Sequence, residues 1–136
     1  MNRSRNSDRF IQLLGSIRDH LRTHPAVGAV ASVSASRFEG GCITVQLEAV
    51  ELVPLAAGLL AWANTIGDVT AAVWRIRVSG TMHLRIVGHL RDLTWIEVYG
   101  GVPHSEAVFG DLQPGGRQSV ALSVLRAWAN GEAVTS

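Results

Sequence analysis

Histidines and arginines alternate with apolar residues along one stretch of the chain, residues 81–101 (TMHLRIVGHLRDLTWIEVYGG). This pattern predicts two strands joined by a tight turn near Arg91 and Asp92, because successive side chains of a strand point to opposite faces. One face would be dry, with Met82, Leu84, Ile86, Gly88, Leu90, Thr94, Ile96 and Val98. The other would be polar, with Thr81, His83, Arg85, Val87, His89, Arg91, Trp95, Glu97 and Tyr99.

A further strand, starting at Asp68, precedes this hairpin. Its residues alternate as Ala72, Trp74, Ile76 and Val78 against Val73, Arg75 and Arg77. We expect the two arginines to join the polar face of the hairpin. The candidate binding residues are then Arg75, Arg77, His83, Arg85, His89, Trp95 and Tyr99.

Two binding chemistries fit such a face. Exposed Trp, Tyr and Arg are enriched in protein interfaces, which predicts a non-catalytic interaction module that forms a homodimer or docks another protein. Guanidinium groups among rings also suit single-stranded nucleic acid, where they meet phosphates and bases. Glu97 in the middle of the face and a net charge of only +1 oppose that alternative.

Other reactive residue types do not form a convincing site in the sequence. His104, Ser105 and Glu106 are adjacent in a loop, and adjacent side chains rarely converge on one reacting atom. His20 and His24 would share one side of a helix, but no further metal ligand is evident. Cys42 falls on the polar face of an early strand, and its role stays open. We therefore predict no catalytic residues, no metal and no cofactor, while an enzyme whose site is not visible in the sequence remains an alternative.

The composition points to a folded protein of ordinary charge. The 136 residues are 47% hydrophobic and 17% charged, enough for one domain with a core. All basic residues are arginine, which suggests a GC-rich genome. The single cysteine, the polar N-terminus and the lack of an apolar run long enough to cross a bilayer predict a cytoplasmic protein without a membrane partner.

Periodicity and turn residues predict the order of elements as α-β-β-α-β-β-β-α. Residues 1–6 would be a disordered arm, and residues 7–136 one α+β domain with an antiparallel sheet of about five strands and three helices. The first helix would begin at an N-cap, Ser7, and end near His24. The second, from Glu51 to Asn64, is apolar nearly all round, which predicts burial on two sides, against a second helix or another subunit. The last would run from Arg117 or Ser119 to Asn130.

This order resembles that of the roadblock/LC7 domain, a small dimeric module that scaffolds small GTPases and motors. The segment His24–Ala29 sits where that family has a short turn into its first strand, and the likeness is one of topology. The order is also close to that of secretion-chaperone-like folds, which dimerise as well. Residues 59–64 (LLAWAN), 97–103 (EVYGGVP), 109–112 (FGDL) and 121–126 (ALSVLR) resemble small actinobacterial proteins without an assigned activity. These resemblances imply a dimer and no particular chemistry.

Overall fold

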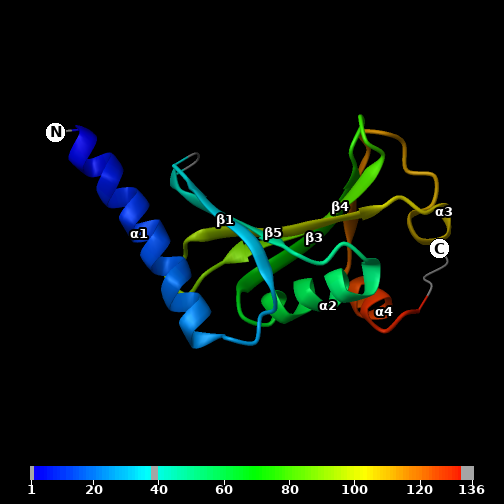
Figure 1. Ribbon diagram of the computed structural model, residues 1–136, viewed down its shortest axis with the longest axis horizontal. Coiled ribbons are helices and arrows are strands. Elements are labelled where there is room, and N and C mark those ends of the chain that lie inside the picture. Colours follow the sequence, from blue (N-terminus) through cyan, green and yellow to red (C-terminus); the bar gives the residue numbers. More distant parts are fainter. Residues whose placement is uncertain (1, 38–39, 133–136) are drawn as a thin grey trace.

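The computed structural model describes residues 2–37 and 40–132, and side chains from Ser7 onward. Four helices and six strands follow one another along this part of the chain (Figure 1). In order they are α1 (Asn2–Thr23), β1 (Val30–Ser36), β2 (Cys42–Leu47), α2 (Leu52–Ala63), β3 (Gly67–Arg75), β4 (Thr81–His89), β5 (Trp95–Pro103), α3 (Glu106–Phe109), β6 (Arg117–Val120) and α4 (Leu122–Ala129). The fold is therefore mixed α+β, as the sequence indicates.

The strands form one sheet in the order β1-β2-β5-β4-β3-β6. All neighbours are antiparallel except β2 and β5, which run parallel. The prediction of a purely antiparallel sheet of about five strands is thus wrong in two respects. The chain leaves β2 through α2 and re-enters the sheet at β3, and two hairpins then bring β5 back beside β2 in the same direction. Alternation within a strand carries no information on such a distant pairing.

Three further boundaries differ from those predicted. Helix α1 begins at Asn2, so Ser7 lies inside it and is not the N-cap; the predicted arm is helical from Asn2, and Met1 lies outside the described residues. Helix α3 occupies a segment expected to be a loop. Residues 117–120, expected to open the last helix, instead pair with β3 as strand β6, and α4 starts at Leu122. Four residues are too short to show a period, so only the pairing reveals the strand.

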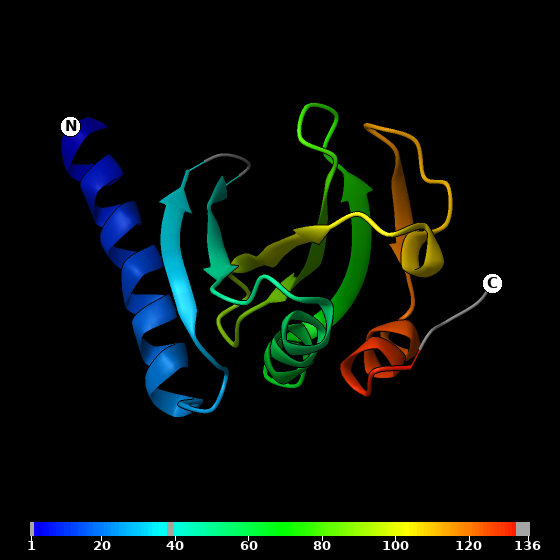
Figure 2. The ribbon, with the colours of Figure 1, turned by 45° about the vertical axis from the view of Figure 1, so that its right-hand side comes forward.

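One face of the sheet is covered by helices. In β4 and β5 every second residue is buried, which confirms the predicted dry face of the central hairpin. Helices α2 and α4 pack against each other and lie side by side next to the sheet (Figure 2). The core between the layers includes Leu55, Leu59 and Trp62 of α2, all fully buried. Burial of α2 against both the sheet and α4 explains why it is apolar nearly all round.

Helix α1 lies beside β1, the strand at one edge of the sheet (Figure 2). Leu13 and Ile17 anchor it in the core, since both are almost completely buried. The ring of His20 stacks on Trp62 of α2 at 5.4 Å between centroids, and its Nε2 lies 2.9 Å from the Thr65 hydroxyl. These contacts hold α1 on the helix side of the sheet, and none of the helices in the described part of the chain covers the opposite face.

Candidate functional site: the open face of the sheet

The face of the sheet opposite α2 and α4 is here called the open face. None of the side chains that the strand registers place on it is buried. It combines rings and charges from four neighbouring strands: Trp74 of β3, His83, Arg85 and His89 of β4, Trp95, Glu97 and Tyr99 of β5, and Arg117 of β6. The hairpin positions predicted from the sequence therefore do share one accessible surface.

Rings on the open face touch across three strands. The ring of His83 meets Trp74 at 4.9 Å between centroids, edge to face, and Tyr99 at 5.5 Å in a stacked arrangement. Gly101 lies opposite His83 in the register, and a methyl group built there would come within 3.4 Å of the His83 ring. Trp74, His83 and Tyr99 thus form a continuous aromatic surface, which we call the ring cluster. A second ring pair, His89 and Trp95, lies at the turn end of the hairpin, with 4.6 Å between the ring centroids.

Two guanidinium groups flank the ring cluster. Arg85 and Arg117 each place Cζ 5.4 Å from the centroid of the Trp74 ring, within the range of a cation–π contact. Arg85 also donates a hydrogen bond from Nη1 to Glu97 Oε2 at 3.1 Å, and both side chains are about a quarter exposed. The charge of Arg85 is therefore matched within the face, which leaves less positive potential than the sequence pattern suggests.

His83 adds no cation at neutral pH. Its burial among the rings lowers its pKa below the ordinary value, and the nearby Glu97 carboxylate only partly opposes this effect. A neutral imidazole stacks on Tyr99 without a charge to desolvate. The centre of the face is thus an apolar and aromatic platform with one internal ion pair.

Two of the predicted site residues, Arg75 and Arg77, do not join the group of rings and charges on the open face. Arg75 pairs in register with Met82 of the dry face, and its Nη1 donates to the Leu112 carbonyl at 3.0 Å. Arg77 follows the end of β3, and its guanidinium lies near Gly115. The predicted parity of β3 is wrong: Ala71 and Val73 are buried on the helix side, so Trp74 lies on the open face. The sequence prediction missed Trp74 and Arg117. That Trp74 lies opposite His83 becomes known only from the pairing register of β3 with β4.

The predicted histidine pair and the loop triad have separate structural roles. The rings of His20 and His24 are 4.6 Å apart, and burial followed by the charge of His24 lowers the pKa of His20. His104 stacks on Phe109, while Ser105 is the N-cap residue of α3. Among the described residues, no group of three or more His, Cys, Asp or Glu side chains is placed to hold a metal ion.

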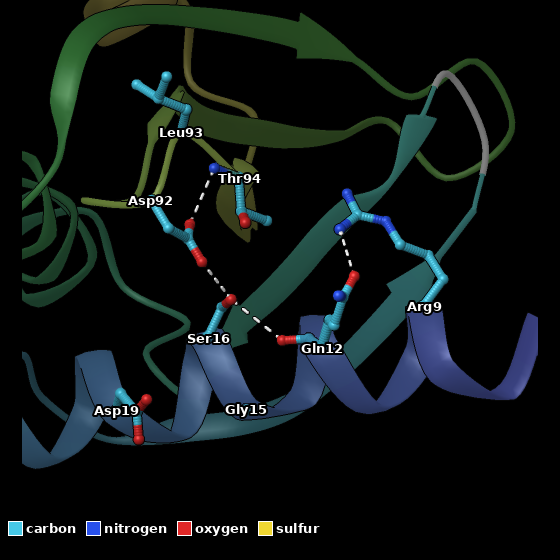
Figure 3. A pocket seen from close by; sticks show the side chains of 8 residues that line it. All are labelled: Arg9, Gln12, Gly15, Ser16, Asp19, Asp92, Leu93 and Thr94. Carbon is cyan, nitrogen blue, oxygen red and sulfur yellow. Dashed lines mark hydrogen bonds between the residues drawn. The ribbon is translucent and has the colours of Figure 1, made fainter. Parts of the chain in front are cut away.

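A polar hollow of about 400 Å³ separates α1 from the turn between β4 and β5 (Figure 3). Ser16 of α1 donates a hydrogen bond to the Asp92 carboxylate, which also accepts a hydrogen bond from the Thr94 amide at 3.0 Å. At the other end Arg9 donates to the Gly40 carbonyl at 2.7 Å. These contacts fasten α1 to two turns of the sheet, so the polar side chains of the hollow are accounted for by structure.

The pKa of Asp92 agrees with its role in linking α1 to the turn between β4 and β5. Burial by itself would raise the pKa of its carboxyl group, but the hydrogen bonds from Ser16 and Thr94 outweigh that effect and lower it. The ionised form is thereby favoured in the fold.

Comparison of the chain with protein-family models, with curated proteins and with solved structures gave no match. Within the part of the chain that the structure describes, no helix is long and apolar enough to cross a membrane.

Proposed function

We propose that this chain is a non-catalytic interaction module that docks a protein partner on the open face of its sheet. The observation that supports this proposal is the ring cluster: Trp74, His83 and Tyr99 form an aromatic surface on a face without a covering helix. Aromatic groups of this kind dominate binding energy when a partner excludes water from them.

The charge pattern favours a protein over nucleic acid as that partner. Arg85 is matched by Glu97, and the lowered pKa of His83 keeps its ring neutral near pH 7. Arg117, on the edge strand β6, is then the exposed cation beside the ring cluster. Nucleic acid needs several unmatched cations, because neutralising phosphates supplies most of its affinity. A protein segment with aromatic or aliphatic side chains and little net charge fits this face better.

A peptide-display screen tests the proposal. Purified protein selects peptides from a random library, and the affinity of each selected peptide is measured by titration. We expect Trp74→Ala and Tyr99→Ala each to weaken binding at least about tenfold, the effect of losing one aromatic anchor worth 1.4 kcal/mol or more. Val78→Ala, at a residue 96% exposed in the turn after β3, is the control and should leave affinity unchanged.

A second titration with single-stranded DNA and RNA separates the alternatives. Binding of oligonucleotides that falls steeply with salt and that strengthens in Glu97→Gln, where Arg85 loses its partner, would replace the proposed function with nucleic-acid binding. If the selected peptides bind the Trp74 and Tyr99 variants as well as the original protein, the open face is a solvated surface and the proposal is wrong.

A further inference from the structure

The ring cluster carries hydrogen-bond donors that have no acceptor. Within the described part of the chain, the indole N–H of Trp74 and the hydroxyl of Tyr99 have no hydrogen-bond partner, and neither group is buried. The Glu97 carboxylate on the same face is already bonded to Arg85. Covering a donor without supplying an acceptor costs free energy. A partner that docks on the ring cluster must therefore bring acceptors of its own.

The outer rings of the cluster also set a distance that the partner has to match. The ring centroid of His83 lies 4.9 Å from that of Trp74 and 5.5 Å from that of Tyr99. Strands β3 and β5 lie on either side of β4, so they are about 10 Å apart at roughly 4.8 Å per strand spacing. The Trp74 and Tyr99 rings are therefore separated by about the same distance.

One regular backbone conformation combines this spacing with free acceptors. A polyproline II helix repeats every three residues at 3.1 Å per residue, so side chains at i and i+3 are about 9 Å apart on one side, and its carbonyl groups make no internal hydrogen bonds. Side chains on one face of a β-strand recur at about 7 Å and 13 Å, and neither interval fits. An α-helix repeats at about 10.5 Å over seven residues, but its carbonyl groups are bonded internally.

We infer that the open face binds a proline-rich segment in the polyproline II conformation, with prolines three residues apart on Tyr99 and Trp74. This inference rests on the proposed function and names the class of its partner. Proline restricts the backbone before binding, so less conformational entropy is lost on docking. Its pyrrolidine ring packs on aromatic side chains, and the carbonyl groups of the segment accept from the Trp74 indole and the Tyr99 hydroxyl.

Arg117 adds a charge requirement beside the Trp74 ring. It lies opposite Trp74 in the register, with its Cζ 5.4 Å from the ring centroid, and it forms no ion pair with the described residues. Two residues of a polyproline II helix span about 6 Å. An acidic residue two positions beyond the proline on Trp74 therefore reaches the guanidinium. The expected partner sequence is Pro-x-x-Pro-x-Glu or Pro-x-x-Pro-x-Asp, read in either direction because the rings do not fix the direction of the segment.

Fluorescence anisotropy with labelled synthetic peptides tests the inference. The first peptide has six prolines between two glutamates, which presents the expected spacing in both directions. The second has six alanines in place of the prolines, and the third has glutamine in place of both glutamates. We expect the first peptide to bind with a dissociation constant below about 1 mM and at least about tenfold more tightly than the alanine peptide.

Substitutions on the open face separate the ring, donor and charge contributions. Trp74→Ala and Tyr99→Ala should each weaken binding of the first peptide at least about tenfold. Tyr99→Phe keeps the ring and removes the donor, so a loss of about fivefold is expected. Arg117→Gln should weaken the glutamate peptide about threefold and leave the glutamine peptide unchanged. Val78→Ala, at a residue 96% exposed in the turn after β3, is the control and should leave both affinities unchanged.

Circular dichroism melting checks that every variant is folded. A proline peptide that does not bind below about 1 mM, that binds no more tightly than the alanine peptide, or that binds the Tyr99→Ala protein unchanged would each overturn the inference. The display screen keeps this failure distinct from failure of the proposed function. Selected peptides that lack the proline spacing and still lose affinity in Trp74→Ala would leave the open face as a docking surface and reject only the proline-rich partner.

Discussion

Gly100 and Gly101 are neighbours on β5. Gly100 faces the helices and Gly101 faces the open side of the sheet, so replacing each by alanine tests which side is closely packed. A methyl group at Gly100 would overlap Cδ1 of Leu55, a fully buried residue of α2. A methyl group at Gly101 would lie 3.2 Å from Thr81 Cγ2 and 3.4 Å from His83 Cδ2, two half-buried side chains of the open face. The first collision is enclosed by the core, whereas the second can be relieved toward solvent.

The magnitudes follow from these contacts. Extra volume in a filled core costs roughly 1–3 kcal/mol. Removing a glycine restricts the unfolded chain and returns about 0.4–1 kcal/mol, and this gain is common to both variants. It cancels in the comparison, so we expect Gly100→Ala to be less stable than Gly101→Ala by roughly 1–3 kcal/mol. Gly101→Ala itself should stay within about 0.5 kcal/mol of the original protein.

Urea unfolding followed by far-ultraviolet circular dichroism measures both free energies of unfolding. The comparison is valid if the slope against urea concentration is the same in all three proteins, because that slope reports the surface exposed on unfolding. Equal free energies for the two variants, or a larger loss at Gly101, would refute the assignment of α2 to the face of Gly100.

Two predictions concern pH. Burial lowers the pKa of His20, so below about pH 6.5 the unfolded chain binds a proton that the folded chain resists, and the free energy of unfolding should fall between pH 7 and pH 5. Urea titrations should show that His20→Gln flattens this fall only in part, because burial also lowers the pKa of His83; an unchanged slope would contradict the assignment. The pKa of Asp92 is lowered, so the stability it contributes is present above about pH 4 and is lost as the pH falls further through its folded value. Asp92→Asn should weaken that acid-side loss in thermal melts, and a melting temperature that falls just as steeply in the variant would show that the tether to α1 does not form.

The central hairpin was predictable because its signal is local. Met82, Leu84 and Ile86 alternate with His83 and Arg85 without interruption, and the structure buries the first set and leaves the second half-buried. A one-residue slip would bury two ionisable groups, so the pattern allows one register. Helix α2 was predictable for a similar reason, with its apolar residues confined between Glu51 and Asn64.

The strand before the hairpin shows where local reasoning failed. Either parity of β3 gives an apolar set, and Arg75 and Arg77 favour the one that puts them on the polar face and Trp74 on the dry face. The structure places Val73 in the core, at 4% exposure. Trp74 consequently stacks with His83 on the open face, and Arg75 turns toward the loop at Leu112. The candidate site therefore excludes Arg75 and Arg77 and includes Trp74 and Arg117.

Local pattern in the sequence predicts the α+β class, the two faces of the central hairpin and the double-sided burial of α2, since each depends on residues close together in the chain. Four features became known from the folded structure: the parallel pairing of β2 with β5, the parity of β3, the small strand β6 and the position of α1 beside β1. These features depend on contacts between residues far apart in the chain. Local periodicity allows several strand pairings and parities, and the free energy of packing determines which one forms. The ring cluster belongs to the second group, because three rings from three strands meet only after the register is set.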